Sequence, residues 1–279
     1  MIIAIIVNYT KPQAKELARE TARFLQQRSC RVVGPESEDV EGISPISAVD
    51  AKEIDFVISL GGDGSMLAFV HNYPELEAPI LGVNFGTLGF LADITPANLF
   101  RSLELVLAGH YVVQERLMLE GVKNDGTCCF AVNEMVVHRG PNYNLVDIGL
   151  TVNGKYFNTF SADGVIVATP SGSTAYSLSA GGPIVSPELQ AVVITPICPH
   201  ALSNRPIVLQ MPETIEVEYL SEYEPLEVAF DGICRFTLQP KEKFTLRRAR
   251  RAFRLISVPG FDYFATLRGK LNWTGSLRN

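Results

Sequence analysis

The strongest chemical signal in the chain is a glycine-rich segment around one carboxylate, Gly61-Gly62-Asp63-Gly64-Ser65. It directly follows the apolar run 54–60, which is typical of a buried strand. Glycines let a phosphate approach the backbone, and a helix starting after Ser65 would aim free N–H groups at an anion. A carboxylate in such a turn would take a proton from a hydroxyl or hold a metal. The segment indicates phosphoryl transfer but not the acceptor, and an ordinary turn aspartate is the alternative.

A second glycine segment, residues 82–91, follows the next expected strand. Two neighbouring strand ends of a parallel sheet line one crevice, so we expect both glycine segments to belong to one site. Phe90 would either cover an adenine ring or belong to the core. Because no G-x-G-x-x-G pattern follows the first expected strand, a Rossmann-type dinucleotide site is not indicated.

Two further segments carry polar groups that suit a nucleotide. The pair Asn133-Glu134 interrupts an apolar run, and its donors and acceptors suit the vicinal hydroxyls of a ribose, although a solvent-facing strand end is the alternative. The segment 161–183 runs from an expected strand into a turn of small polar residues. A helix opening at Ser173 or Thr174 would offer free amides, and small neighbours of Tyr176 would admit a flat ligand; an ordinary loop is the alternative.

The elements that must position these residues fall into two classes. Residues 1–98 alternate strand and helix patterns, which predicts an α/β domain with a parallel sheet. Residues 99–258 begin with a helix and continue as short β-branched segments with hairpin turns at 124–126 and 153–154, which predicts an antiparallel all-β domain. Residues 259–279 carry a helix pattern at 261–271 that we expect to return to the first domain.

Composition narrows the function further. The chain has 279 residues, 47% of them hydrophobic, and a net charge of −6, which gives no drive toward nucleic acid or an anionic membrane. No run is long enough to span a bilayer and the apolar start lacks a basic flank, so a cytoplasmic protein is expected. No C-x-x-C pair is present, and we expect no zinc site or disulfide framework but reduced thiols at Cys30, Cys128, Cys129, Cys198 and Cys234. The basic stretch 241–254 is expected to be a solvated face, with attraction of an anionic nucleotide as the minority interpretation.

Taken in chain order, these segments resemble the NAD kinase family over nearly the whole chain. The glycine pentad alone is shared with diacylglycerol kinases, sphingosine kinases and 6-phosphofructokinases. The segments that carry the specific resemblance to the NAD kinase family are Asn133-Glu134, Asp163-Gly164 and the run 172–183, and the run 199–206 also resembles it. It implies ATP-dependent phosphorylation of NAD at the 2′-hydroxyl of its adenosine ribose, with a divalent cation such as Mg²⁺ and no assigned metal ligand. It also implies a homodimer or homotetramer.

The residue-by-residue match implies Asp63 as the general base, with Gly61, Gly62, Gly64 and Ser65 as the turn that phosphates approach. Phe90 would contact adenine, Asn133 and Glu134 the ribose, and Asp163 the nicotinamide amide. The implied NAD-binding set is Asp63, Gly64, Phe90, Asn133, Glu134, Asn144, Ser161, Asp163, Thr174, Ala175, Tyr176 and Ser179.

The chain departs from the family pattern at four positions. Ser65 stands where Thr is commoner, Asn144 and Ser161 where many relatives carry a basic or other polar residue, and Ile233 where a ligand-side Gln is frequent. Ile233 is therefore left out of the site. A lipid or sphingoid-base kinase and a non-catalytic NAD sensor are the competing hypotheses; no amphipathic surface helix supports the first, and the intact Asp63 opposes the second.

Overall fold

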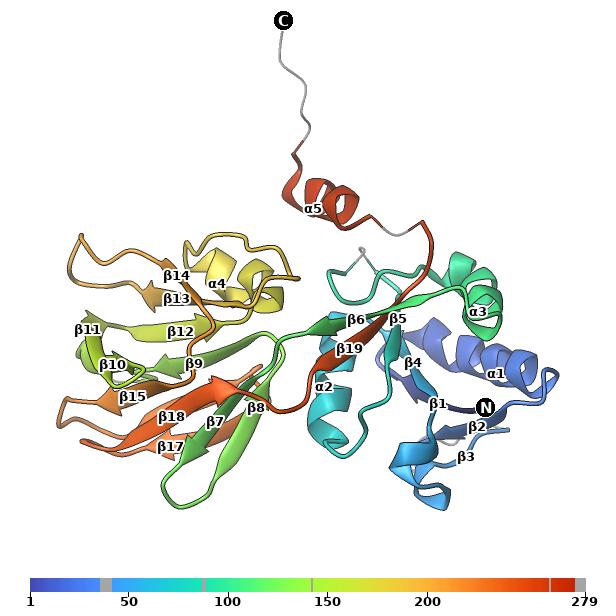
Figure 1. Ribbon diagram of the computed structural model, residues 1–279, viewed down its shortest axis with the longest axis horizontal. Helices are drawn as coiled ribbons and strands as arrows, with labels where there is room; N and C mark the ends of the chain where they lie inside the picture. The colour runs from blue at the N-terminus through green and yellow to red at the C-terminus, as the bar shows by residue number, and fades with distance from the viewer. Residues whose placement is uncertain (36–41, 87–88, 142, 261, 274–279) are drawn as a thin grey trace, which may run out of the picture. The chain divides into compact units, whose positions relative to one another are not determined.

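The computed structural model describes residues 1–35, 42–86, 89–141, 143–260 and 262–273. The chain forms two compact units, one of Met1–Glu115 with Arg254–Asn279 and one of Arg116–Phe253 (Figure 1). The expected boundary after residue 98 is therefore too early. Helix α3 (Leu99–Leu107) belongs to the first unit because its apolar face, Leu99, Leu103 and Val106, is buried in that unit's core.

The first unit is built on a sheet with the strand order β3-β2-β1-β4-β5-β19-β6. β1 is hydrogen-bonded in parallel to both β2 and β4, and β4 is parallel to β5. The chain thus builds outward from β1 in both directions, and this reversal leaves a crevice at the carboxyl ends of β1 and β4. The strands are β1 (Ile2–Val7), β2 (Arg31–Gly34), β3 (Ser44–Pro45), β4 (Phe56–Gly61), β5 (Ile80–Asn84), β6 (Val112–Arg116) and β19 (Phe253–Ser257).

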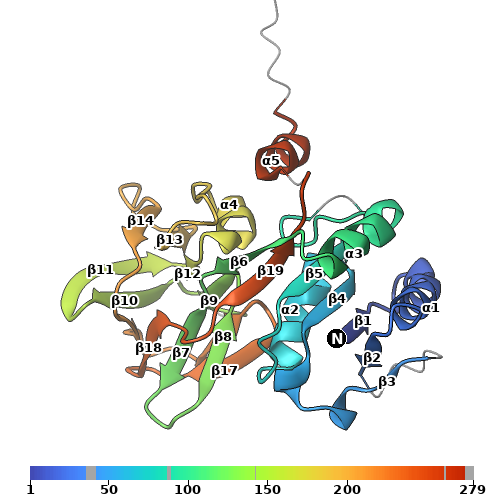
Figure 2. The same ribbon diagram turned by 45° about the vertical axis from the view of Figure 1, so that its right-hand side comes forward.

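Helices cover both faces of this sheet. Helix α1 (Pro12–Gln26) buries a stripe of small residues and Leu25 against one face, together with α3. Helix α2 (Asp63–Asn72) contacts β4 and β5 from the other face (Figure 2). Helix α5 (Tyr263–Leu271) begins after Asp262, whose side chain accepts a hydrogen bond from the Phe264 N–H. The α/β prediction is confirmed, and the expected start of α5 at residue 261 lies outside the described residues.

The second unit consists of two six-stranded antiparallel sheets that enclose one core. The strand orders are β11-β10-β15-β18-β7-β8 and β14-β13-β12-β9-β16-β17. The core between the sheets takes inward side chains from both, such as Ile148 and Tyr219 from one and Val165 and Val228 from the other. The hairpins at 124–126 and 153–154 are present as predicted. The strands are β7 (Leu119–Lys123), β8 (Cys128–Ala131), β9 (Glu134–His138), β10 (Val146–Val152), β11 (Lys155–Ala162), β12 (Gly164–Ala168), β13 (Ala191–Ile197), β14 (Ile207–Gln210), β15 (Ile215–Tyr219), β16 (Leu226–Phe230), β17 (Cys234–Leu238) and β18 (Lys243–Arg248).

Strand β19 corrects the expected extent of the β domain. The sequence pattern at 253–258 predicts a strand correctly, but the strand pairs in parallel with β5 through Leu255 and Ile80. Its buried residues are apolar whichever sheet receives them, so the run itself does not identify its sheet. The chain therefore rejoins the first unit's sheet before helix α5.

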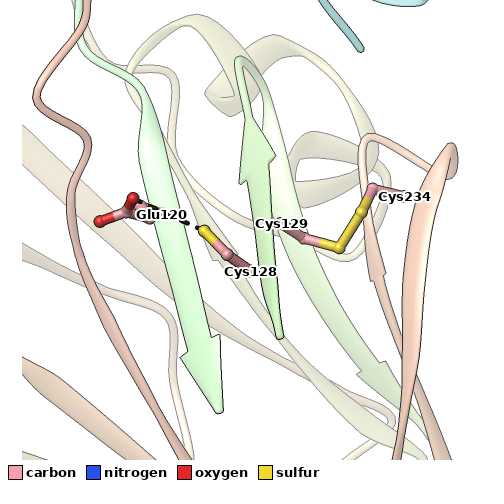
Figure 3. The surroundings of a disulfide bond; sticks show 4 residues. All are labelled: Glu120, Cys128, Cys129 and Cys234. Atoms are coloured by element: carbon pink, nitrogen blue, oxygen red, sulfur yellow. Dashed lines mark hydrogen bonds between the residues drawn. A yellow bond between two sulfur atoms is a disulfide. The ribbon is translucent and has the colours of Figure 1, made fainter. Parts of the chain in front are cut away.

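A disulfide contradicts the expectation that all five thiols are reduced. Cys129 on β8 is bonded to Cys234 on β17, with 5.9 Å between their Cα atoms, so the bond joins the two sheets of the second unit (Figure 3). Cys128 points to the opposite face of β8, because successive side chains on a strand alternate. Its Sγ lies 3.5 Å from Glu120 Oε1, and burial together with that carboxylate raises the pKa of Cys128 to about 11. A pairing across 105 residues leaves no spacing signature in the sequence.

Candidate functional site

The carboxylate of Asp63 is held by the loop that follows β5. Its Oδ2 accepts a hydrogen bond from the Phe90 N–H at 2.9 Å. Its Oδ1 accepts from the N–H groups of Leu91 at 3.1 Å and Ala92 at 2.8 Å. The two glycine segments thus lie together as predicted, and the hydrogen bonds of Asp63 connect them. Three amide donors fix the orientation of the carboxylate, and Oδ2 keeps the greater share of its acceptor capacity.

The glycines around Asp63 are accommodated for different physical reasons. Gly62 has a φ of 155° and precedes α2 as its N-cap, so the strand can turn directly into the helix. A Cβ on Gly61 would lie 2.1 Å from Ser65 Oγ. A Cβ on Gly64 would meet no atom of the described residues within 4 Å, so none of them demands a glycine there. Helix α2 begins at Asp63, two residues earlier than expected, and its first turn therefore contains the carboxylate.

A cleft of about 380 Å³ opens over this turn at the carboxyl ends of β1 and β4. Two cations line it, Lys11 after β1 and Lys270 on α5, and sequence reasoning assigned a role to neither. The Lys270 Nζ also lies 5.1 Å from the centroid of the Phe90 ring. Phe90 is half-buried and packs against Tyr263 with 6.3 Å between ring centroids, so it is not a core residue. Lys11 was detectable, since it closely follows the carboxyl end of a predicted strand.

A second carboxyl group lies next to the loop that holds Asp63. The pKa of Asp93 is raised to about 7, mainly by burial and to a smaller extent by the negative charge of Asp63, while a backbone hydrogen bond opposes the rise. Asp93 faces a separate cavity of about 420 Å³ with Arg101 and Asp262 in its lining. Sequence reasoning did not single out Asp93, because an aspartate before a helix is ordinary.

In the second unit, the pair Asn133-Glu134 precedes the body of β9. Glu134 is 9% exposed, and its Oε2 has no hydrogen-bond partner among the residues that the structure describes. The pKa of Glu134 is raised to about 8, mainly by burial and also by the charge of Asp231, while a hydrogen bond from the backbone of Tyr176 opposes the rise. An unpartnered buried carboxyl oxygen is costly in the isolated protein, so it points to a hydrogen-bonding ligand. Glu134 is therefore not the solvent-facing residue of the alternative interpretation.

The turn after β12 contacts the backbone next to the same pair, Asn133 and Glu134. The Thr169 N–H donates to the Asn133 carbonyl at 2.8 Å, and the Thr169 hydroxyl donates to the Val132 carbonyl at 2.6 Å. A Cβ on Gly172 would lie 2.1 Å from the Asn133 carbonyl oxygen, so only glycine permits this approach. The expected helix at Ser173 or Thr174 is wrong. Residues Ser171–Thr174 form a 3₁₀ turn and α4 (Tyr176–Ser179) is a single turn, because the chain bends outward at Ala175.

The remaining predicted residues divide between the two ends of β12. Thr174, Ala175, Tyr176 and Ser179 lie at the Glu134 end, since Glu134 pairs with Ala168. Asp163 precedes β12 at its other end, five residues away, which corresponds to about 17 Å of strand. The predicted NAD-binding residues of this unit are thus not one cluster but two.

At its own end of β12, Asp163 is not free of protein contacts. Its Oδ1 accepts from the Arg139 Nε at 2.6 Å, and the Arg139 N–H donates to the Asp163 carbonyl at 2.9 Å. Ser161 donates its hydroxyl to Asp147 on β10, and Asn144 is exposed on the preceding loop. Arg139 is a residue that sequence reasoning missed, because a lone arginine after a strand carries no distinctive pattern.

Other expectations concern charge, metals and membranes. The basic stretch is an ion-paired surface, as in the Lys243–Glu216 and Arg247–Glu120 pairs, which agrees with the solvated-face interpretation. Within the described ranges, no group of three His, Cys, Asp or Glu side chains could hold a metal ion. No helix in the described part of the chain is long and apolar enough to cross a membrane.

Comparisons with known proteins agree with this geometry. The model of the ATP-NAD kinase N-terminal domain matches residues 3–111, and that of the ATP-NAD kinase C-terminal domain matches residues 132–258. An NAD kinase of Protochlamydia amoebophila is 49% identical over 278 residues, covering 99% of this chain and 100% of the relative.

Two solved structures are also similar. A yeast NADH kinase complexed with NADH has a TM-score of 0.87 at 27% identity, covering 100% of this chain and 89% of that one. An Archaeoglobus fulgidus NAD kinase in complex with ATP has a TM-score of 0.78 at 25% identity, covering 98% of this chain and 99% of that one.

Proposed function

Because the chain belongs to the ATP-NAD kinase family, we propose that Asp63 is the general base of its reaction. The chain catalyses ATP-dependent phosphorylation of NAD at the 2′-hydroxyl of the adenosine ribose, giving NADP and ADP. In the proposed step the 2′-oxygen bonds to the γ-phosphorus, the bond from that phosphorus to the β–γ bridging oxygen breaks, and Asp63 takes the hydroxyl proton. General-base help of this kind contributes roughly 10²–10⁴-fold to the rate.

The observation that carries this proposal is the hydrogen bonding of Asp63. Three backbone amides hold the carboxylate at the mouth of a cleft, with Oδ2 the less occupied oxygen. Lys11, Lys270 and the first turn of α2 supply positive potential in the same cleft, which suits the phosphates of a nucleotide. We assign proton acceptance to Oδ2 for this reason.

The donor nucleotide has a candidate location beside this cleft. A neighbouring cavity of about 340 Å³ shares Asn8, Gly64 and Ser65 with it. Its wall includes the stacked pair of Phe69 and Tyr73, which suits a flat base. We infer that the base of ATP enters there and that its phosphates reach toward Asp63 over Gly64, where no protein atom fills the space of a Cβ.

A divalent cation such as Mg²⁺ is expected to accompany ATP. The described residues offer no cage of three acidic or His/Cys side chains, and Mg²⁺ commonly binds through substrate phosphates with one or two carboxylates. The donor set at the cleft fits that mode, with Asp63 as the carboxylate within reach. When bound, the cation would neutralise charge on the transferring phosphoryl group.

For NAD, we propose that Asn133 and Glu134 bind ribose hydroxyls. The support is the unpartnered Oε2 of Glu134, which could accept a hydrogen bond from a hydroxyl. Gly64 and Phe90 are proposed to line the adenosine side. Thr174, Ala175, Tyr176 and Ser179 would shape the pocket at the Glu134 end, and Asp163 is assigned to the nicotinamide amide. Asn144 and Ser161 remain proposed contacts, and self-association as a dimer or tetramer remains an expectation.

The experiment that tests the function supplies one acceptor at a time. The purified chain is incubated with ATP and Mg²⁺ and either NAD or diacylglycerol in mixed micelles, and NADP or phosphorylated lipid is measured. We expect NADP formation and no lipid phosphorylation. Lipid phosphorylation without NADP would support the lipid-kinase hypothesis, and binding of NAD without any turnover would support the NAD-sensor hypothesis.

A further inference from the structure

The turn between β16 and β17 carries a carboxylate, Asp231, that accepts hydrogen bonds from three amides at the start of β9. Asp231 follows β16 directly and adopts a φ of 52°, in the left-handed region that aspartate tolerates better than most residues. Asp231 was not among the predicted site residues. An Asp-Gly pair at a hairpin turn is ordinary, so its residue type alone did not mark it as a site residue.

The hydrogen bonds of Asp231 converge on one segment. Its Oδ2 accepts from the Val132 N–H at 2.8 Å, and its Oδ1 accepts from the N–H groups of Asn133 at 2.8 Å and Glu134 at 3.2 Å. In return, the Asp231 N–H donates to the Glu134 carbonyl at 3.0 Å. Three successive amides, at the point where β8 ends and β9 begins, therefore donate to one side chain.

This arrangement restrains the backbone of the proposed ribose-binding pair from one side. The turn after β12 restrains it from the other, through the Thr169 N–H bond to the Asn133 carbonyl and the close approach of Gly172. The side chains of Asn133 and Glu134 are thus carried on a backbone fixed on both sides. Glu134 Oε2 stays buried and without a partner, although a small rotation of a mobile backbone would let it reach water.

We propose that Asp231 is a positioning residue for NAD binding, which presents Asn133 and Glu134 to the ribose by holding three consecutive amides. Asp231 does not touch the substrate in this account. Its effect passes through the geometry of the pair. The inference rests on the proposed ribose-binding role of Asn133 and Glu134.

The test compares Asp231→Asn with Asp125→Asn in the full chain. Asn keeps the shape of Asp231 and can still accept with one oxygen, but its amide group turns an N–H toward that of Val132. Asp125 is the matched control, because it also accepts a backbone N–H, from Thr127 at 2.8 Å, at a hairpin turn of the same unit. We expect Asp231→Asn to raise the KM for NAD by about tenfold and to leave the KM for ATP within about twofold. Asp125→Asn should change neither constant.

Two outcomes would overturn the inference. One is an unchanged KM for NAD in Asp231→Asn, and the other is an equal rise in both KM values, which is what a distortion not specific to the NAD site produces. A double-mutant cycle with Glu134→Gln adds a readout of coupling. We expect the double variant to be less impaired than the two single effects multiplied together, whereas independent multiplication would contradict action through Glu134.

A measurement on the unaltered chain covers the case in which Asp231→Asn does not fold. Amide hydrogen exchange of Val132, Asn133 and Glu134 should be slow before NAD is added, because Asp231 already holds these amides. Fast exchange that slows only with NAD would overturn the inference. The proposed function has a separate failure signature, since Glu134→Ala with unchanged NAD affinity would remove the ribose-binding role itself.

Discussion

Each unit presents a carboxyl group to which we assign a task in the proposed function, and these two groups, Asp63 and Glu134, are held in opposite ways. Asp63 in the first unit accepts three backbone N–H groups and lies in a cleft with two lysines. Glu134 in the second unit is buried, has one oxygen without a partner, and has a pKa raised to about 8. At neutral pH a carboxyl group with that pKa is mostly protonated.

The different surroundings of Asp63 and Glu134 indicate which task each carboxyl group suits. Three amide donors orient the Asp63 carboxylate and two lysines line the same cleft, so this environment suits a group that accepts a proton from a substrate hydroxyl. Glu134 has one backbone donor, from Tyr176, but its Oε2 has no partner among the described residues, and a ligand hydroxyl would supply the missing hydrogen bond. The structure therefore supports a division of labour, with turnover assigned to the first unit's carboxylate and substrate recognition to the second unit's.

The largest expected effect falls on turnover. Asp63→Asn should lower kcat by roughly 10²–10⁴-fold, because the amide keeps the shape of the carboxylate but cannot take the proton. The rate of NADP formation at saturating NAD and ATP measures this. Asp55→Asn is the matched control, since Asp55 also accepts a backbone N–H, from Ile2 at 2.7 Å, but is exposed. A kcat for Asp63→Asn within about threefold of the control would remove Asp63 from its role.

A smaller effect, on stability, concerns only the second unit. Reduction of the Cys129–Cys234 bond should lower the free energy of unfolding by about 2–4 kcal/mol, because a cross-link over 105 residues restricts the unfolded chain. Urea unfolding with and without a reductant measures the change, and Cys234→Ala should be insensitive to the reductant. Cys128→Ser should retain the full sensitivity, because Cys128 faces away from the bond. A sensitivity that disappears in Cys128→Ser would contradict this pairing.

The third effect is a pH dependence. The pKa of Glu134 is about 8 in the folded chain and near 4.5 when unfolded, so the unfolded state binds fewer protons between these values. The contribution of Glu134 to the free energy of unfolding is therefore fully present below about pH 4.5 and is lost as pH rises through 8. Asp93, raised to about 7, contributes in the same direction. Glu134→Gln should flatten the decline between pH 5 and 7 by roughly 1–3 kcal/mol. An identical slope in the variant, measured by urea unfolding without NAD, would count against the raised pKa.

The two units also show how much of the fold and of the candidate site can be predicted from the sequence. The glycine turn at Asp63 and the α/β and all-β classes followed from local patterns, because strand periodicity and glycine geometry are encoded nearby in the chain. Strand β19 and the Cys129–Cys234 bond did not, because each depends on a partner more than a hundred residues away. Lys270, Arg139 and Asp231 were also missed. Their types are ordinary, and only the fold brings them to Phe90, Asp163 and Asn133.

The smallest expected effect concerns the positive charge of the cleft at Asp63. Lys270→Ala should raise the KM for a nucleotide substrate by roughly 3–10-fold, because one cation of the Asp63 cleft is lost, and the effect should shrink at high salt. Lys52→Ala, an exposed lysine of the same unit outside the cleft, is the control. Equal effects of the two variants would show that general surface charge, and not the cleft, attracts the nucleotide.

The most direct test of the division between the two carboxyl groups is calorimetric titration of NAD into two variants. The account predicts that Asp63→Asn binds NAD within about threefold of the unaltered chain, while Glu134→Ala binds it roughly 10–100-fold more weakly, the cost of losing a hydrogen bond to a buried polar group. The reverse pattern, with NAD affinity lost in Asp63→Asn and retained in Glu134→Ala, would contradict it.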